Sequence, residues 1–273
     1  PLPGDSIITT IQRVVIDLHG PRVVRLQMPP DQHRSTLCDH IVCGGGWADV
    51  YWSPDAARLV FASTSRDHRV ANVRVADAAT GAIREVYEER VADFFESGFN
   101  RVNWQPLWAT GELLWYSERT DWGHLYLYDL ATGRLKNPIT SGNWKVLQVL
   151  RADSASRTIF FTAAGREPGD PYFRRLYSVR MDGSRLQLLT PEDGDHDVSL
   201  APDGRFFVDS YSKPDVPPVA VLRDAAGRAL LTVQTADISR LLATGWRPPL
   251  PFTVKARDGR TDLYGLLFRP ASF

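Results

Sequence analysis

The chain has 273 residues, with 32 Lys and Arg against 32 Asp and Glu, so its formal net charge is zero. That balance argues against a nucleic-acid-binding protein, which needs a basic surface. Hydrophobic residues make up 43% and charged residues 23%, an ordinary globular composition that argues against a disordered chain. No apolar run approaches the roughly 20 residues of a membrane helix.

The compartment is not decided by any motif. The chain opens on Pro1 rather than Met, which indicates a processed or excised segment. Its two cysteines, Cys38 and Cys43, are too few for a tetrahedral zinc site, and both a local disulfide and free thiols are compatible with their spacing. A periplasmic or secreted location is favoured over a cytoplasmic one.

Short strands fill the sequence in chain order. Runs of β-branched and aromatic residues stay under ten residues before Gly, Pro or charge interrupts them, which favours strands over helices. Pairs of such strands recur around a glycine turn, and the turn glycines lie 44 to 52 residues apart. The expected pairs are 73–77 with 83–87, 125–129 with 135–139, 176–181 with 185–189, and 219–223 with 229–233, around Gly81, Gly133, Gly183 and Gly227.

These pairs belong to larger units. Hairpins at 50–63 and 198–210 precede two of them, so a unit holds four strands, the size of a β-propeller blade. The sequence therefore predicts an all-β partial ring of about four and a half blades, in preference to a sandwich of hairpins. Complete blades are expected near 47–90, 99–142, 145–191 and 197–237, after two outer strands of a further blade at 13–18 and 23–26.

The pattern changes after residue 237. Residues 247–251 read RPPLP, which is expected to continue neither a ladder nor a helix and indicates a linker. A hairpin is then expected from 252–256 and 263–268, around the turn that contains Gly259. We therefore predict propeller blades over residues 1–245, and a linker with the first hairpin of a second domain over residues 246–273.

Several motifs resemble one known family. Residues 117–129 read SERTDWGHLYLYD, which resembles a hallmark of the propeller of the dipeptidyl peptidase IV family, in the prolyl oligopeptidase superfamily. Residues 139–146, ITSGNWKV, resemble the family's step into the next blade, and LYSV, DG and LT follow in family order between 176 and 190. The resemblance covers roughly residues 47–273. It implies an eight-bladed propeller over an α/β-hydrolase domain, whose first hairpin would be the terminal one here.

The resemblance also implies an activity. Family members are serine exopeptidases that remove Xaa-Pro or Xaa-Ala dipeptides from peptide N-termini, with the nucleophile on a G-x-S-x-G elbow. None of the 273 residues forms that elbow, so we assign no catalytic residue and expect this chain alone to be inactive. The propeller would restrict access to the substrate site and help to shape it. Its partners would be its own hydrolase domain and peptide substrates, without cofactor or nucleic acid, and with a homodimer as one expectation from the open strand edges.

Three residues are candidates for the substrate pocket. Arg101, Asn103 and Trp104 begin the innermost strand of a blade, and the resemblance implies that this stretch can line the pocket. The family's aromatic–arginine pair is not clearly matched at this stretch. The alternative is ordinary inner-strand packing with a tryptophan in the core.

A pair of acidic residues resembles a second family feature. The family binds the substrate's amino terminus with two Glu residues on a helix inserted in the propeller, and Glu88 with Glu89 is a superficial match. The pair follows an outer strand of an ordinary blade, however. We therefore interpret it as a solvated blade edge with Arg90 as its neighbour.

Two further candidates are interpreted as structural. His124 has no partner that the sequence identifies as an acid or nucleophile, so we expect a hydrogen-bonding role within its turn. Asp193, Asp195 and Asp197 alternate as in a calcium loop, but the glycine and glutamate that an EF-hand requires are missing. No metal site is predicted.

Two other functions remain compatible with the sequence. A stand-alone propeller that binds proteins or glycans is one, because propellers serve many functions. An inactive peptidase relative without a nucleophile is the other. The expected terminal hairpin favours a two-domain peptidase over the stand-alone ring.

Overall fold

The computed structural model describes residues 4–20, 22–32, 49–97 and 103–270, and the backbone of residues 42–43 and 46–47. Within these residues strands dominate, and the single helix is the five-residue α1 (Ser239–Ala243), which the sequence analysis did not anticipate. No helix in this part of the chain is long and apolar enough to cross a membrane. Arg101, Cys38 and the side chain of Cys43 lie outside the described residues.

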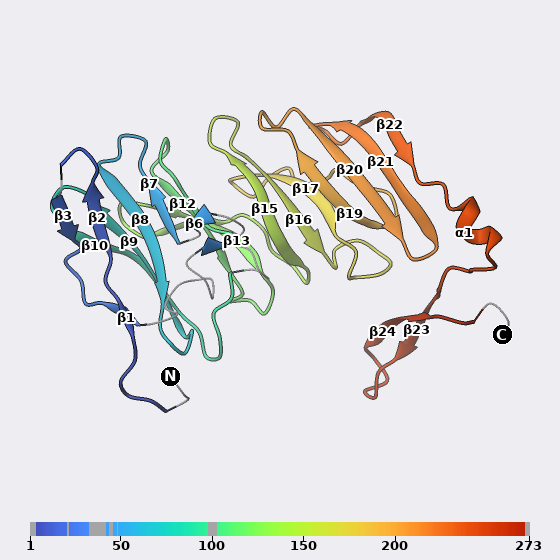
Figure 1. The fold of residues 1–273 in the computed structure, drawn as a ribbon, viewed down its shortest axis with the longest axis horizontal. Helices are drawn as coiled ribbons and strands as arrows, with labels where there is room; N and C mark the ends of the chain where they lie inside the picture. The colour runs from blue at the N-terminus through green and yellow to red at the C-terminus, as the bar shows by residue number, and fades with distance from the viewer. Residues whose placement is uncertain are drawn as a thin grey trace.

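Four antiparallel sheets of four strands follow one another along an open arc (Figure 1). In each sheet the strands pair in chain order, which confirms the predicted propeller blades. Blade 1 is β7 (Val50–Trp52), β8 (Arg58–Thr64), β9 (Val70–Asp77) and β10 (Ile83–Arg90), and blade 2 is β11 (Gln105–Leu107), β12 (Glu112–Ser117), β13 (His124–Asp129) and β14 (Leu135–Pro138). Blade 3 is β15 (Lys145–Asp153), β16 (Thr158–Ala164), β17 (Arg175–Arg180) and β18 (Gln187–Leu188), and blade 4 is β19 (Asp195–Leu200), β20 (Phe206–Lys213), β21 (Val216–Asp224) and β22 (Ala229–Thr235).

Short strand pairs flank the blades. The predicted half-blade is present as β2 (Val14–Asp17) paired with β3 (Arg22–Arg25). Two smaller ladders join β1 (Thr10–Ile11) to β4 (Asp31–Gln32) and β5 (Val42–Cys43) to β6 (Gly46–Trp47).

The terminal hairpin is longer than expected. It consists of β23 (Leu250–Lys255) and β24 (Asp262–Leu267), so Leu250 and Pro251 are in the ladder rather than in a linker. The prediction that all of residues 247–251 form a linker was wrong for Leu250 and Pro251. A two-stranded ribbon has a free edge on each strand, and a proline that donates no hydrogen bond is tolerated there.

The recurring turn glycines bring successive blades into contact. At Gly133 φ is +69°, and a Cβ built there would lie 1.8 Å from the Val86 carbonyl oxygen of blade 1. Only glycine permits both that backbone conformation and that approach. Gly81, Gly183 and Gly227 also have positive φ, so the repeat seen in the sequence marks the turns that dock each blade on the one before it.

The core consists of apolar layers between blades. Between blades 2 and 3, fourteen buried hydrophobic residues form one cluster in the described chain, including Leu114 and Leu127 of blade 2 and Phe161 and Val179 of blade 3. Between blades 3 and 4 the corresponding cluster has only four buried members among the described residues, Phe160, Leu176, Leu189 and Phe207. Four partly buried hydrophobic residues that the structure describes pack against it, so the second junction has the smaller apolar layer of the two.

Candidate functional site

Asn103 connects the inner strands of two blades. Its side chain is 1% exposed, its Nδ2 donates to the Leu147 carbonyl (3.1 Å), and its Oδ1 accepts from the Val149 amide (2.8 Å). The residue precedes β11 of blade 2, and both partners lie in β15 of blade 3. An asparagine side chain matches one donor and one acceptor of a neighbouring strand, so it acts here as a strap between the blades.

Trp104 lies in the junction between blades 1 and 2. It is 2% exposed, packs edge-on against Tyr51 at 4.9 Å between ring centroids, and lies 6.1 Å from Trp115. Its carbonyl accepts the Tyr51 hydroxyl (3.1 Å), while its indole Nε1 has no hydrogen-bond partner within the described residues. Both described pocket candidates are thus buried in blade packing, and their role toward a substrate stays a prediction.

The two adjacent glutamates point in different directions. Glu88 pairs with Arg90 at 2.7 Å on the surface, as expected. Glu89 is 6% exposed, so its interpretation as a solvated edge was wrong. Successive side chains of a strand point to opposite faces, and that of Glu89 in β10 points toward blade 2. Its carboxylate accepts hydrogen bonds from three blade 2 side chains, Trp115 Nε1 (2.7 Å), Arg119 Nη2 (3.1 Å) and the Ser117 hydroxyl.

His124 has the structural role that the sequence predicted. The ring is 1% exposed, with Nε2 2.9 Å from the Gly142 carbonyl and Nδ1 3.0 Å from the Thr140 hydroxyl. The carbonyl can only accept, so Nε2 carries the proton and Nδ1 accepts from the hydroxyl, which describes a neutral imidazole. Burial lowers the pKa of His124, in agreement with that state. The pair resembles a nucleophile with its base, but Thr140 is 4% exposed and thus inaccessible to a substrate.

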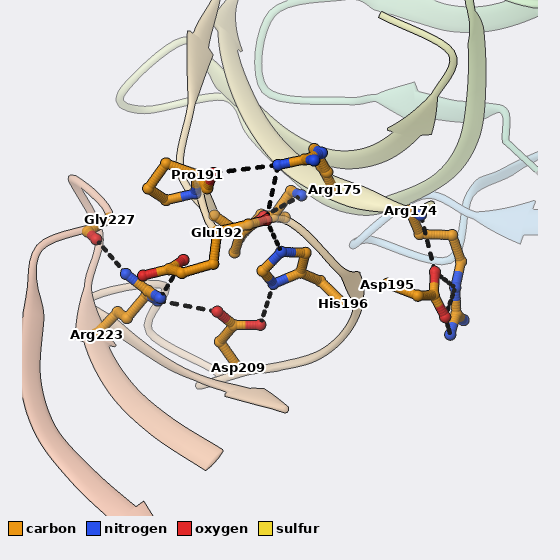
Figure 2. Close-up of polar contacts among 11 residues, drawn as sticks. Arg174, Arg175, Pro191, Glu192, Asp195, His196, Asp209, Arg223 and Gly227 are labelled. Atoms are coloured by element: carbon orange, nitrogen blue, oxygen red, sulfur yellow. Dashed lines mark hydrogen bonds and ion pairs between the residues drawn. The ribbon is translucent and has the colours of Figure 1, made fainter. Parts of the chain in front are cut away.

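A buried cluster of charges joins three strands of blade 4 (Figure 2). His196 of β19 lies with Nδ1 2.8 Å from Asp209 Oδ1 of β20 and with Nε2 2.9 Å from the Glu192 carbonyl. Arg223 of β21 donates from Nε to Asp209 Oδ2 (2.9 Å), and its Nη2 lies 2.6 Å from Glu192 Oε2. The side chains of His196, Asp209 and Arg223 are at most 2% exposed.

Three members of this cluster are potential metal ligands. One ligand atom each from Glu192, His196 and Asp209 lies within 4.8 Å of the others. Arg223, however, lies 2.9 Å from Asp209 Oδ2 and 2.6 Å from Glu192 Oε2, so a guanidinium already faces both carboxylates. The group is therefore an ion cluster, and its residues do not fit a metal as they are arranged here.

Sequence reasoning missed this cluster because its members come from separate strands. The alternating aspartates drew attention to the same segment, but Asp193 pairs with Lys213 (3.0 Å) and Asp195 with Arg174 (2.7 Å). An alignment of the blade repeats would have revealed the cluster, because it places charged residues where the preceding blade has apolar ones. His196 occupies the position that Val146 occupies in blade 3, since their amides donate to the equivalent carbonyls of Arg174 and Gly123.

A cavity of about 610 Å³ separates the blades from the terminal hairpin. Tyr172, from the loop between β16 and β17, and Tyr264 of β24 meet edge-on across this region at 6.3 Å. Asp193 and Lys213 line the same cavity. Asp193 directly follows Glu192 of the ion cluster in the sequence. The remaining walls are Gly169, Asp170, Phe173, Pro214, Asp215, Pro251, Phe252, Thr253, Gly265 and Leu266.

Comparison with known proteins identifies the family. Residues 1–218 match the model of the dipeptidyl peptidase IV (DPP IV) N-terminal region, which is most of the chain. The chain belongs to this family. The DPP IV resemblance drawn from residues 117–129 and 139–146 is thereby confirmed.

Individual relatives agree with the DPP IV assignment. Dipeptidyl peptidase 4 of Arthroderma otae is 31% identical over 106 residues, which are 37% of this chain and 13% of that protein. A probable dipeptidyl-aminopeptidase B of Aspergillus oryzae is 35% identical over 94 residues, 32% of this chain and 10% of that protein.

Solved structures share the fold. The crystal structure of Porphyromonas gingivalis dipeptidyl peptidase 4 matches with a TM-score of 0.76 at 19% identity, over 97% of this chain and 35% of that one. A putative dipeptidyl aminopeptidase IV from Bacteroides ovatus matches with a TM-score of 0.73 at 20% identity, over 98% and 42%. This chain therefore spans about a third to two fifths of the length of these proteins.

The DPP IV hallmark segment is a packing motif in this structure. Gly123 lies against the Tyr116 ring, where a Cβ would come within 1.9 Å of the hydroxyl oxygen. Asp121 adopts a φ of +66°, which permits the tight turn into β13, and His124 then fixes the loop that leads to blade 3. The motif that identifies the family thus holds a blade in place.

Proposed function

We propose that this chain is the non-catalytic propeller segment of a dipeptidyl peptidase IV-like serine exopeptidase, which removes N-terminal Xaa-Pro or Xaa-Ala dipeptides. The observation that carries the proposal is the family match over residues 1–218, on a chain that forms four successive blades. The catalytic elbow is missing from its 273 residues. The nucleophile, acid and base would belong to a hydrolase domain in the parent protein.

The propeller's task would be steric. Rigid blades around an opening exclude folded proteins and admit extended peptides, and the close-packed junctions described above supply that rigidity. The hairpin β23–β24 would be the first element of the hydrolase domain, with the boundary near residue 245. The cavity between hairpin and blades is consistent with a domain junction at this place.

The pocket candidates would divide the work. Arg101 would contact the peptide, whereas the buried Asn103 and Trp104 would position the strand that follows it. Asn103 suits this role because it links the inner strands of blades 2 and 3 directly. Loss of these two hydrogen bonds would weaken the contact between the inner strands of blades 2 and 3 and leave the contacts of the outer strands unchanged.

The test compares this chain with the longer gene product that the proposal requires. We expect the longer product to hydrolyse Gly-Pro-p-nitroanilide but not its N-succinyl form, and to lose activity with diisopropyl fluorophosphate, which modifies reactive serines. This chain alone should hydrolyse neither substrate. A folded longer product without activity would reject the peptidase and favour a binding module or an inactive relative.

A matched pair of variants tests the positioning role. In the longer product, Asn103→Ala should raise KM several-fold, and it should also lower thermal stability because the Leu147 carbonyl and the Val149 amide lose their partner. Asn137→Ala is the control, because Asn137 also bridges blades 2 and 3, by donating to the Met181 carbonyl (3.0 Å), but from the outer strand β14. Equal effects of the two substitutions on KM would reject a specific role for the inner strap.

A further inference from the structure

We infer that His196 is held as an imidazolium at neutral pH, and that its second proton is a structural component of the junction between blades 3 and 4. Both ring nitrogens face acceptors. Nε2 lies 2.9 Å from a backbone carbonyl and Nδ1 lies 2.8 Å from a carboxylate oxygen. Neither acceptor can donate when the carboxylate is ionised, so both nitrogens must carry a proton.

The proton between His196 and Asp209 belongs on the ring. The alternative is a neutral imidazole beside a protonated Asp209. Arg223 disfavours it, because its Nε donates to the other oxygen of the same carboxylate at 2.9 Å and stabilises the ionised form. The pair is thus an imidazolium and a carboxylate, both fully buried.

The charged groups around the ring are compatible with an imidazolium. The buried carboxylate of Asp209 and the 34% exposed side chain of Glu192 face Arg223 and His196. Arg175 donates to the Glu192 carbonyl (2.7 Å) and lies 3.5 Å from the exposed carboxylate of Asp193. With an imidazolium the cluster has three positive and three negative groups. Asp209 and Glu192 together balance Arg223 and the imidazolium.

The groups around the cluster do not disturb this balance. Lys213 pairs with Asp193 (3.0 Å) and approaches Asp215 (4.0 Å), while Arg174 and Asp195 neutralise each other on the surface. The Tyr211 phenol of β20 also packs on the ring, at 5.2 Å between ring centroids. Figure 2 shows the imidazole enclosed between the loop at Glu192 and the carboxylate of Asp209.

The cluster replaces an apolar core at equivalent positions. Matching backbone hydrogen bonds place His196, Asp209 and Arg223 of blade 4 where blade 3 has Val146, Phe161 and Val179. Those three residues belong to the apolar layer between blades 2 and 3. Blade 4 therefore docks through this ion cluster as well as through a small apolar cluster. Loss of the second proton of His196 leaves a ring nitrogen against an acceptor and should loosen the blade as pH rises.

The direct test is nitrogen-15 NMR of the imidazole rings in the 273-residue chain at about pH 7.5, where an ordinary histidine is mostly neutral. His196 should show two protonated ring nitrogens, and His124 one protonated and one unprotonated, which makes it an internal control with equal burial. The single variants His196→Gln and His124→Gln assign the signals. An unprotonated nitrogen in His196 under these conditions overturns the inference.

Stability measurements provide an independent readout. The triple variant His196→Val, Asp209→Phe and Arg223→Val copies the residues of blade 3. The free energy of unfolding of the unchanged chain should fall as pH rises above about 6.5, since the unfolded state releases the proton that the folded state keeps. The triple variant should show a smaller fall over the same range, and an identical pH profile would contradict the inference. Stabilisation by added Zn²⁺ that requires His196 would also overturn it, in favour of a metal site.

Discussion

The two junctions on either side of blade 3 have the same backbone architecture but different interiors. Between blades 2 and 3, aromatic and aliphatic side chains such as Phe161 and Val179 fill the layer. Between blades 3 and 4, the equivalent positions hold Asp209 and Arg223, and the apolar cluster is small. Blade geometry therefore depends on strand pairing and turns, while the chemistry of the layer between blades is free to vary.

The difference has consequences for how each junction fails. An apolar layer loses stability in proportion to the volume removed from it, and it tolerates changes of shape. An ion cluster loses most when one partner is removed, because the remaining charges stay buried without compensation. The predictions below separate these two behaviours, from the largest expected effect to the smallest.

Removal of Arg223 should be the most damaging change. Arg223→Met should lower the free energy of unfolding by about 3–5 kcal/mol, because Asp209 and Glu192 lose their shared partner. The control is Arg205→Met in the same blade, whose side chain is 76% exposed and should change stability by less than about 0.5 kcal/mol. Denaturant midpoints measure both, and a small effect at Arg223 would mean that the cluster contributes little.

Alanine substitutions at the turn glycines should show how closely the backbone of each blade approaches the blade before it. Gly183 and Gly227 have the same φ of +84°, but the atom nearest to an added Cβ differs in distance. At Gly183 it is the Pro138 carbonyl oxygen at 3.2 Å, and at Gly227 it is the Leu189 carbonyl oxygen at 2.6 Å. Gly183→Ala should destabilise by about 1–2 kcal/mol through backbone strain. Gly227→Ala should lose about 1–2 kcal/mol more, since Leu189 must also move. Equal losses in thermal unfolding would show that the closer approach has no energetic role.

The rim of the apolar junction should respond to acid. Burial alone would raise the pKa of Glu112, but hydrogen bonds from Arg157 of blade 3, then Lys136 and Thr110, outweigh it and lower the pKa to about 2. Its stabilisation is therefore complete above about pH 4.5 and is lost as pH falls toward 2.

Glu112→Gln should then lower the free energy of unfolding by about 1–2 kcal/mol near neutral pH, less than full linkage predicts because Arg157 and Lys136 are partly exposed. The variant should also show a flatter stability profile between about pH 4.5 and 2. A profile unchanged from that of the parent chain would contradict the assignment. This acid sensitivity is opposite in sign to the effect expected at His196.

The smallest effect is expected at the exposed ion pair beside the cluster. Arg174→Gln removes two hydrogen bonds to the Asp195 carboxylate, of 2.7 and 2.9 Å. The side chain of Arg174 is 45% exposed and that of Asp195 is 36% exposed. We expect a loss of about 0.5 kcal/mol that disappears in concentrated salt, because water and ions screen such pairs. A loss comparable to that of Arg223→Met would mean that the surface pair belongs to the buried cluster.

Strand pattern and turn chemistry were sufficient to predict the blades. Alternating residues, Gly turns at a spacing of 44 to 52 residues and Pro-Asp or Asp-Gly hairpins are local signals, and all four blades were correctly anticipated. The hairpin was found but its start was misplaced, because the proline rule does not apply at a free edge. The short helix α1 gave no periodic signal over its five residues.

Side-chain environments were harder to predict, since they depend on which blade lies opposite. Glu89 was expected in solvent because acidic residues usually are, but its strand places it against Trp115 of the next blade. The sequence placed Asn103 and Trp104 at the start of an inner strand. Their burial between blades depends on the tertiary structure and could not be predicted. Neighbouring blades are about fifty residues apart in sequence, so no short motif records their contacts.

The sequence by itself determined the fold class, the blade count and the family, because these follow from periodicity, turns and local motifs. Only the tertiary structure decided that His196, Asp209 and Arg223 form one buried unit with both imidazole nitrogens on acceptors. The physical reason is that hydrogen-bond partners from three strands meet only after the sheet has formed. A residue's protonation state then depends on those partners, since a buried ring must match its donors and acceptors to theirs.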